Sequence, residues 1–234
     1  MSRESTRCLH NLSGPDTVKI SPTDATLALN VVINNNHSYS EIGGDMESKS
    51  LEGMRVAILA TDDFEESELF EPRQALDNAG AKTTVVAPKA GKIQAMKHDE
   101  KTIKINVDRT LDEADADDFD AVLFPGGALN ADALRVVEAA QEFVRGIDES
   151  GKPIAVICHA PWLLVSSDLV DGRTITSYHT IQDDIRNAGG NWVDKEVIRH
   201  ENWVSSRQPS DIPAFNREMI KLFREQREKS KQAA

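Results

Sequence analysis

The sequence has few cysteines, few aromatic residues and no long apolar segment. Only two of its 234 residues are cysteine, Cys8 and Cys158, and 5% are aromatic. Two cysteines so far apart do not form the disulfide framework of a small secreted domain, and we expect no disulfide bond. The longest nearly apolar run, residues 153–165, is too short to span a bilayer. No secretory signal follows the charged first residues, so we expect a cytoplasmic protein without a membrane partner.

The charge is strongly unbalanced toward acidic residues. The chain has 27 Lys and Arg against 39 Asp and Glu, which gives a formal net charge of −12. Nucleic-acid binding depends on a concentrated basic face that neutralises phosphates, and no such face is visible. With 39% hydrophobic residues the chain can still bury a substantial core. We therefore expect a globular protein with no nucleic-acid partner.

The composition divides the chain into an extension and a body. Residues 1–53 are rich in Ser, Asn, Thr and Asp and show no sustained periodicity, which predicts a flexible N-terminal extension. Within it, the β-branched segment 26–33 could pair as one strand. The extension contains Cys8. Residues 54–234 are predicted to form one domain that carries Cys158.

The body alternates short apolar runs with amphipathic helical stretches. Continuous, branched runs of this kind suit strands that are covered on both faces, as in a parallel sheet. We predict a three-layer, doubly wound α/β sandwich of the flavodoxin-like type, with a mostly parallel sheet and a small antiparallel excursion. The predicted strands are 56–60, 83–87, 121–124 and 154–157, with shorter ones at 174–176, 197–198 and 203–205; the predicted helices are 66–79, 132–149, 160–165, 180–188 and 211–227; the excursion is 94–107.

The residue after the fourth strand is the first candidate for chemistry. Cys158 lies between a buried strand and a helix with Pro161 in its first turn. This arrangement resembles a nucleophile elbow, in which the helix N-terminus favours the reactive thiolate. His159 could act as a general acid or base if its ring reaches the sulfur. The alternative is an inert, buried structural cysteine.

Two other strand ends carry weaker signals. Gly126 and Gly127 follow the third strand, and their amides, with that of His159, could form an oxyanion hole; a plain turn is the alternative. An acidic run follows the first strand and contains Glu65. Such a run is usually a solvated helix start, unless one carboxylate turns inward toward Cys158.

Several ordered motifs together resemble the PfpI-type intracellular cysteine proteases of the ThiJ/PfpI superfamily, over about residues 54–226. The resemblance to class I glutamine amidotransferases is at the level of the fold only. The matching segments are VAILATDDFEESEL, AVLFPGG, GKPIAVICHAPWLL, GRTITSYHTIQDDIRNAGGNWVD and NWVSSRQPSDIPAFNRE.

The resemblance implies roles for individual residues. Cys158 matches the nucleophile, His159 the histidine beside it, and Glu65 the carboxylate that hydrogen-bonds the cysteine when protonated. Asp132 is the nearest equivalent of an acidic residue that reaches the histidine from a neighbouring subunit, with one extra residue before it. Tyr178 matches a tyrosine near the site. The family implies a homodimer or larger ring with a shared active site.

A thiolate near a base and backbone amides is suited to attack an electrophilic carbon, but it does not name the substrate. The resemblance implies a stress-protective glyoxalase-like or deglycase-like enzyme that acts on reactive carbonyls or glycated groups. The alternatives are an intracellular cysteine peptidase and a non-catalytic redox sensor that uses Cys158. No metal-ligand spacing and no nucleotide-binding motif are present, so we expect neither a metal nor another cofactor, and a small carbonyl or peptide substrate.

Overall fold

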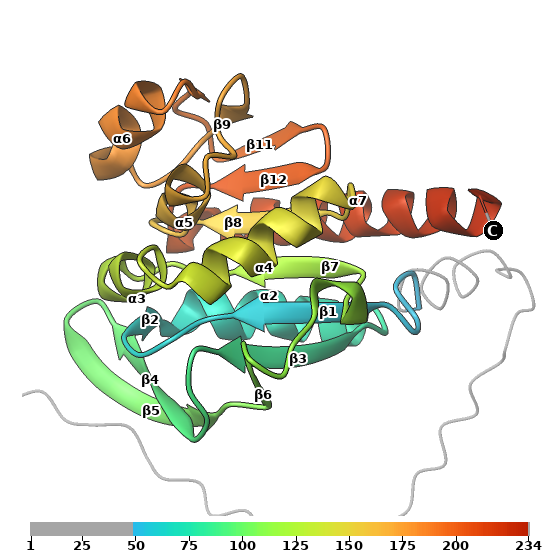
Figure 1. Cartoon of the computed structure of the whole chain (residues 1–234), viewed down its shortest axis with the longest axis horizontal. Helices are drawn as coiled ribbons and strands as arrows, with labels where there is room; N and C mark the ends of the chain where they lie inside the picture. Colours follow the sequence, from blue (N-terminus) through green and yellow to red (C-terminus); the bar gives the residue numbers. More distant parts are fainter. Residues whose placement is uncertain (1–48, 234) are drawn as a thin grey trace, which may run out of the picture. The chain divides into compact units, whose positions relative to one another are not determined.

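A seven-stranded sheet forms the centre of the computed structural model, which describes residues 49–233 (Figure 1). The strand order is β11-β12-β8-β7-β1-β3-β6, and every neighbouring pair is parallel except β11 with β12. The strands are β1 (Arg55–Leu59), β3 (Lys82–Ala87), β6 (Arg109–Thr110), β7 (Ala121–Phe124), β8 (Ile154–Ile157), β11 (Val197–His200) and β12 (Trp203–Ser206). The four long strands predicted from the sequence are confirmed.

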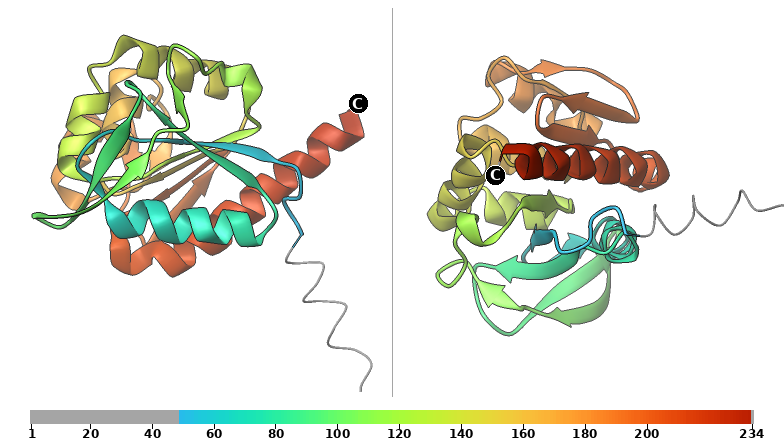
Figure 2. Two further views of the ribbon diagram at one scale, coloured as in Figure 1. Left: turned by 90° about the horizontal axis from the view of Figure 1, so that it is seen from below. Right: turned by 90° about the vertical axis from the view of Figure 1, so that its right-hand side faces the viewer.

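Helices cover both faces of this sheet (Figure 2). On one face lie α2 (Glu66–Asn78) and α7 (Ile212–Ala233), which contact each other. On the other face lie α3 (Ala128–Leu134), α4 (Glu138–Glu149) and α5 (Pro161–Ser166). The predicted three-layer, doubly wound α/β sandwich is therefore confirmed, as is a flavodoxin-like arrangement with a mostly parallel sheet.

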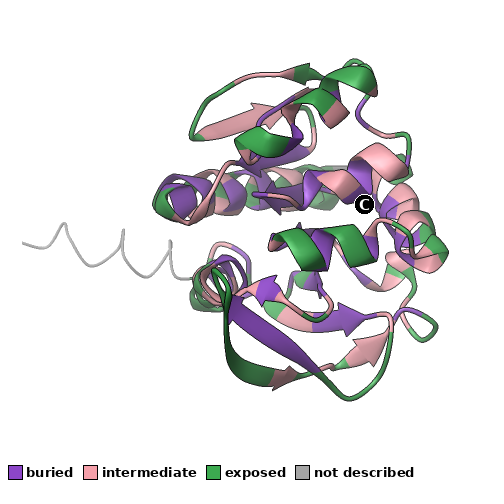
Figure 3. Ribbon diagram, turned by 90° about the vertical axis from the view of Figure 1, so that its left-hand side faces the viewer, coloured by how far each residue is buried: buried purple, intermediate pink, exposed green. Residues whose placement is uncertain are grey.

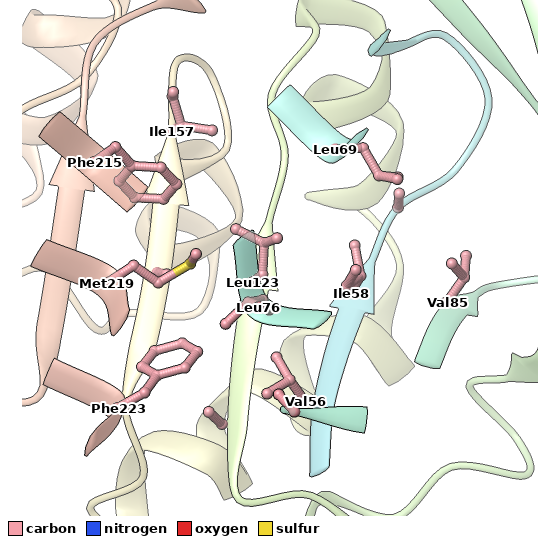
Figure 4. Close-up of a cluster of buried hydrophobic side chains, with 14 of the residues drawn as sticks. Val56, Ile58, Leu69, Leu76, Val85, Leu123, Ile157, Phe215, Met219 and Phe223 are labelled. Carbon is pink, nitrogen blue, oxygen red and sulfur yellow. The ribbon is translucent and has the colours of Figure 1, made fainter. Parts of the chain in front are cut away.

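The core follows from the two-residue period of the strands. In β1, Val56 and Ile58 point toward α2 and α7, while Ala57 and Leu59 belong to the cluster on the other face. Both sets are fully buried, which explains why the strand reads as one continuous apolar run. Figure 4 shows the first cluster, where Phe215 of α7 packs beside the sheet. Buried residues concentrate along the central strands (Figure 3).

A second, small sheet stands over the carboxyl end of β1. The strands β4 (Lys92–Lys97) and β5 (Glu100–Asn106) form an antiparallel hairpin, and β2 (Phe64–Glu65) pairs with β4. The Asp63 amide donates to the Gln94 carbonyl at 2.8 Å, and the Gln94 amide donates to the Asp62 carboxylate at 2.8 Å. The predicted antiparallel excursion is thus confirmed, and it is tied to the turn after β1.

The segment after α5 consists of short elements. It contains one short parallel strand pair and two short helical pieces around residues 174–192. These elements are β9 (Thr174–Ile175), η2 (His179–Ile181), α6 (Gln182–Asn187) and β10 (Asn191–Trp192); the remaining 3₁₀ turns are η1 (Ala116–Asp118) and η3 (Pro209–Asp211).

The predicted helix 132–149 is wrong, because the chain forms two helices there. α3 begins at Ala128, directly after Gly127, and α4 begins only at Glu138. Between them, Val137 adopts an extended conformation with φ −89° and ψ 109°. Two consecutive β-branched residues, Val136 and Val137, lose side-chain freedom in a helix and favour such a break.

The domain begins earlier than the predicted boundary at residue 54. Leu51 is fully buried, and its amide donates to the Ala79 carbonyl at 2.8 Å. Arg227 of α7 donates to the Ser50 carbonyl at 2.9 Å, so residues 49–53 belong to the folded unit. Cys8 and the predicted strand 26–33 lie outside the described residues. Within the described part, no helix is both long enough and apolar enough to cross a membrane.

Candidate active site

The turn from β8 into α5 places Cys158 in an unusual backbone conformation. Its φ is 62°, in the left-handed region that residues other than glycine rarely adopt. The turn is held on both sides: the Cys158 amide donates to Ser206 at 3.1 Å, and the Tyr178 amide donates to the Cys158 carbonyl at 2.9 Å. Strain of this kind persists where surrounding structure enforces it, and it often marks functional sites. The predicted elbow is present, with Pro161 at the start of α5.

The imidazole of His159 reaches the sulfur. His159 Nδ1 lies 3.1 Å from Cys158 Sγ, and Nε2 lies 3.2 Å from the hydroxyl of Thr180. The ring stacks on Tyr178 with centroids 4.7 Å apart. Burial lowers the pKa of His159, and the neighbouring His179 acts in the same direction. The imidazole is therefore neutral near pH 7 and can accept the thiol proton.

A buried carboxyl group, that of Glu68, is the acidic partner of the sulfur. Glu68 is fully buried, and its Oε2 accepts a 2.9 Å hydrogen bond from the Gly126 amide. Glu68 and Cys158 both approach Gly126 and line the same cavity, so the carboxyl group lies beside the cysteine. Burial raises the pKa of Glu68 to about 8. The carboxyl group is thus protonated at neutral pH and carries a hydrogen that it can donate.

The predicted assignment of this role to Glu65 is wrong. Glu65 is only half-buried, and its Oε2 accepts a 3.0 Å hydrogen bond from the amide of His98, at the tip of the β4–β5 hairpin. Glu65 lies in β2, whose pairing with β4 directs this residue toward the hairpin. Three residues later, Glu68 shares the inward stripe of α2 with Pro72 and Leu76, all buried. Glu68, Pro72 and Leu76 are spaced four residues apart, which places them on one face of a helix. This spacing is the sequence signal that could have identified Glu68 as the carboxylate that faces inward.

The glycine pair after β7 is required by the close approach of three segments. A Cβ added to Gly126 would lie 2.6 Å from the Cys158 Cβ, which no side chain tolerates. Gly127 has φ 90° and backs onto the turn after β1. The predicted oxyanion hole needs one change, because the Gly126 amide is already bonded to Glu68. The amides of Gly127 and His159 remain as candidate donors, because both residues line the cavity that contains Cys158.

Asn130 organises this region and had no role in the sequence analysis. It is fully buried in α3, and its Nδ2 donates to the carbonyls of Pro125 at 3.1 Å and Gly126 at 2.9 Å. Its Oδ1 accepts the Thr61 amide at 2.7 Å. Asn130 therefore joins the turns after β1 and β7. A single asparagine near a helix start gives no signal that would predict this.

The resting state of the cysteine differs from the prediction that a helix N-terminus favours its thiolate. Burial raises the pKa of the Cys158 thiol, and any negative charge on Glu68 raises it further. The amides of Gly127 and His159 act in the opposite direction. α5 has only six residues, so the effect of burial prevails. The site therefore rests as a thiol, with the neutral His159 positioned to take its proton.

Comparison with known proteins decides the family. The profile of the DJ-1/PfpI family matches residues 54–222. The chain belongs to the DJ-1/PfpI family. Relatives include a putative cysteine protease, YraA, of Bacillus subtilis, 41% identical over 73% of this chain and 98% of its own length. Deglycase TK1284 of Thermococcus kodakarensis is 43% identical over 73% of this chain and 100% of its own length.

Solved structures of DJ-1/PfpI proteins have the same fold. Drosophila melanogaster DJ-1beta matches with a TM-score of 0.66 and 25% identity, and the match covers 74% of this chain and 95% of that one. The resemblance inferred from the motifs is therefore confirmed.

A cavity of about 420 Å³ opens onto the sulfur. It is lined by Glu65, Glu68, His98, Gly127, Ala128, Cys158, His159, Tyr178, Gln208, Pro209 and Ser210. Most of the predicted site residues thus meet in one place, including Tyr178. A neighbouring cavity of about 510 Å³ shares Glu65, His98 and Pro209 with it.

Asp132 is not brought to the sulfur within the chain. It is exposed on α3 and does not line the cavity, so its predicted role across a subunit boundary stays a prediction. Among the described residues, no group of three or more His, Cys, Asp or Glu side chains is arranged to hold a metal ion. The expectation that no cofactor is needed also stays a prediction.

Proposed function

We propose that this protein is a cysteine-dependent enzyme that acts on reactive carbonyls or glycated groups, as a glyoxalase-like or deglycase-like, stress-protective activity. The observation that carries the proposal is the 3.1 Å contact between Cys158 Sγ and a neutral His159 imidazole. The contact faces a small cavity. The name of the deglycase relative supports this reaction class.

The geometry supports nucleophilic attack by the cysteine. The thiol proton moves to His159 Nδ1 as Sγ bonds to the carbonyl carbon, and the electron pair of the C=O bond moves to oxygen. Gly127 and His159 line the same cavity as Cys158, and we assign their amides as the donors that stabilise the charge on that oxygen. The protonated Glu68 adds no second negative charge beside the sulfur.

The size of the cavity favours small substrates. About 420 Å³ accommodates a dicarbonyl or one modified side chain, within the usual range for small-molecule sites. The alternative is an intracellular cysteine peptidase, which the name of the YraA relative supports. A second alternative is a redox sensor that uses Cys158. The raised pKa of the thiol lowers the thiolate fraction for oxidation and for attack on a carbonyl alike, so the pKa does not separate these two functions.

The decisive assay compares three substrates with the full-length protein. Methylglyoxal, a methylglyoxal-modified arginine peptide and casein are each incubated with the wild type and with Cys158→Ser. We expect turnover of at least one carbonyl substrate, abolished in Cys158→Ser, and little casein cleavage. Cys8→Ser is the matched control and should retain full activity.

Other outcomes would favour the alternatives. Cysteine-dependent cleavage of casein without any carbonyl turnover would establish the peptidase. Reversible oxidation of Cys158 by peroxide, with no turnover of any substrate, would establish the sensor. Carbonyl turnover that persists in Cys158→Ser would overturn the proposal.

A further inference from the structure

We propose that Thr180 is a positioning residue, whose hydroxyl orients the His159 ring through its contact with Nε2. The inference rests on the proposed function in one respect, that His159 serves as the base for Cys158. It concerns a hydroxyl of the same chain and is separate from the role predicted for Asp132 across a subunit boundary.

The two ring nitrogens of His159 face different partners. Nδ1 lies 3.1 Å from Cys158 Sγ, and Nε2 lies 3.2 Å from Thr180 Oγ1. A neutral imidazole has one N–H donor and one acceptor nitrogen. If Nδ1 is to accept the thiol proton, the hydrogen must reside on Nε2 and be donated to Thr180 Oγ1. The hydroxyl thus selects the tautomer that can act as the base.

The same hydrogen bond survives the proton transfer. When the thiol proton moves to Nδ1, Nε2 keeps its hydrogen and continues to donate it to Thr180 Oγ1. Since the hydroxyl is uncharged, it does not hold the imidazole in its charged form beforehand. This agrees with the neutral resting state of His159, whose pKa is lowered by burial and by His179.

The segment that carries Thr180 is fixed to the cysteine turn. The Tyr178 amide donates to the Cys158 carbonyl, and the Tyr178 ring stacks on His159. Trp162 lies near the His159 ring, at a centroid distance of 5.4 Å, and its indole N–H donates to Asp184 of α6 at 3.1 Å. These contacts place the 3₁₀ turn η2, with Thr180 in it, at a defined position relative to the imidazole.

Few ionisable residues of the described chain lie near the His159 ring. Cys158, Tyr178 and His179 are its neighbours, and the cavity that it lines also holds Glu65, Glu68 and His98. Within the described part of the chain, the Thr180 hydroxyl is the hydrogen-bond partner of Nε2. Replacing that hydroxyl by a carboxylate should therefore change the charge state of the pair.

The test measures the alkylation of Cys158 by iodoacetamide between pH 5 and 10, in the full-length protein. The Cys158 peptide is quantified by mass spectrometry, so Cys8 does not interfere. Thr180→Val keeps the shape of threonine but removes the hydrogen bond, and should lower the rate at pH 7 by about 3- to 10-fold. Thr180→Ser should restore the rate. Thr180→Asp should stabilise the imidazolium and move the profile to lower pH.

Two controls make the result specific. Thr102→Val, at an exposed position of β5, should leave the profile unchanged. Asp132→Asn tests the carboxylate that the resemblance places across a subunit boundary. A wild-type profile in Thr180→Val, or a loss that Thr180→Ser does not restore, would overturn the proposal. A profile changed by Asp132→Asn and not by Thr180→Val would overturn it as well.

The alkylation readout separates this inference from the proposed function. A protein with the expected Thr180 dependence but no carbonyl turnover would retain the positioning role and refute the function. Carbonyl turnover together with a wild-type alkylation profile in Thr180→Val would support the function and refute the positioning role.

Discussion

The two turns that meet at the sulfur, after β8 and after β1, are built in different ways. The turn after β8 is short, and its residues Cys158 and His159 both face the site. The turn after β1 and the first turn of α2 contain five acidic residues, of which Glu68 alone is fully buried. In the turn after β8, the functional groups are held in place by residues adjacent in the sequence. In the region after β1, the packing of α2 against the sheet determines which carboxylate faces the site.

The acidic residues of the second region have separate partners. Asp62 accepts the Gln94 amide, and Glu65 accepts the His98 amide, so both hold the β4–β5 hairpin. Glu68 faces inward because α2 packs its Pro72 and Leu76 stripe against the sheet. Neighbouring carboxylates thus have different roles: two hold the hairpin and one lies in the site. Their positions along α2 and the turn before it determine which one lies beside the sulfur.

The largest effect on activity should come from a side chain inserted at Gly126, between Cys158 and Glu68. Gly126→Ala places a Cβ 2.6 Å from that of Cys158 and also against Glu68. We expect kcat/KM to fall by about 100-fold or more and the free energy of unfolding to drop by about 1–3 kcal/mol. Activity assays and urea unfolding measure the two effects.

Gly172→Ala is the control for this substitution. Unlike Gly126, Gly172 has a positive φ, of 71°, and no atom lies within 4 Å of an added Cβ. It should cost stability through backbone strain, by about 1–2 kcal/mol, and leave activity intact. Equal activity losses in both variants would show that close approach at Gly126 is unimportant.

Substitutions of Glu68 and Glu65 should have different effects on activity. Glu68→Leu removes the acceptor for the Gly126 amide and the buried carboxyl group beside Cys158, and should lower kcat/KM by about 10- to 100-fold. Glu68→Gln resembles a protonated carboxyl group and should retain most of the activity. Glu65→Leu should change kcat less than about threefold, since Glu65 holds the hairpin. The opposite ranking of the two leucine variants would restore the role to Glu65.

A smaller effect, on stability, follows from the raised pKa of Glu68. Its pKa of about 8 in the folded protein exceeds the ordinary value of 4.5, so the folded state binds the proton more tightly. The contribution is fully present below about pH 4.5 and is lost as pH rises through about 8. Between these values it lowers the free energy of unfolding by at most about 1.4 kcal/mol per pH unit.

Urea unfolding of the wild type and Glu68→Gln at several pH values measures this dependence. The difference between the two proteins should shift steadily across the window, because the glutamine does not titrate. A difference that is constant with pH would show that Glu68 has an ordinary pKa in the folded protein.

Most of the fold and half of the site could be predicted from the sequence. The runs at 121–124 and 154–157 coincide with β7 and β8, because buried parallel strands need continuous apolar residues. The elbow at Cys158 was predictable because it depends on one strand and one helix. Glu68, Asn130 and Thr180 were not predicted, since each makes a hydrogen bond to a residue far away in the chain, namely Gly126, Thr61 and His159 respectively.

The most direct test of the account is to look for a substrate adduct on Cys158. The full-length protein is mixed with methylglyoxal, quenched at intervals and analysed by peptide mass spectrometry, while product is followed in parallel. The account predicts a transient adduct on the Cys158 peptide, with product formation that Cys158→Ser abolishes. Product formed at the same rate by Cys158→Ser, with no adduct on Cys158 in the wild type, would contradict it.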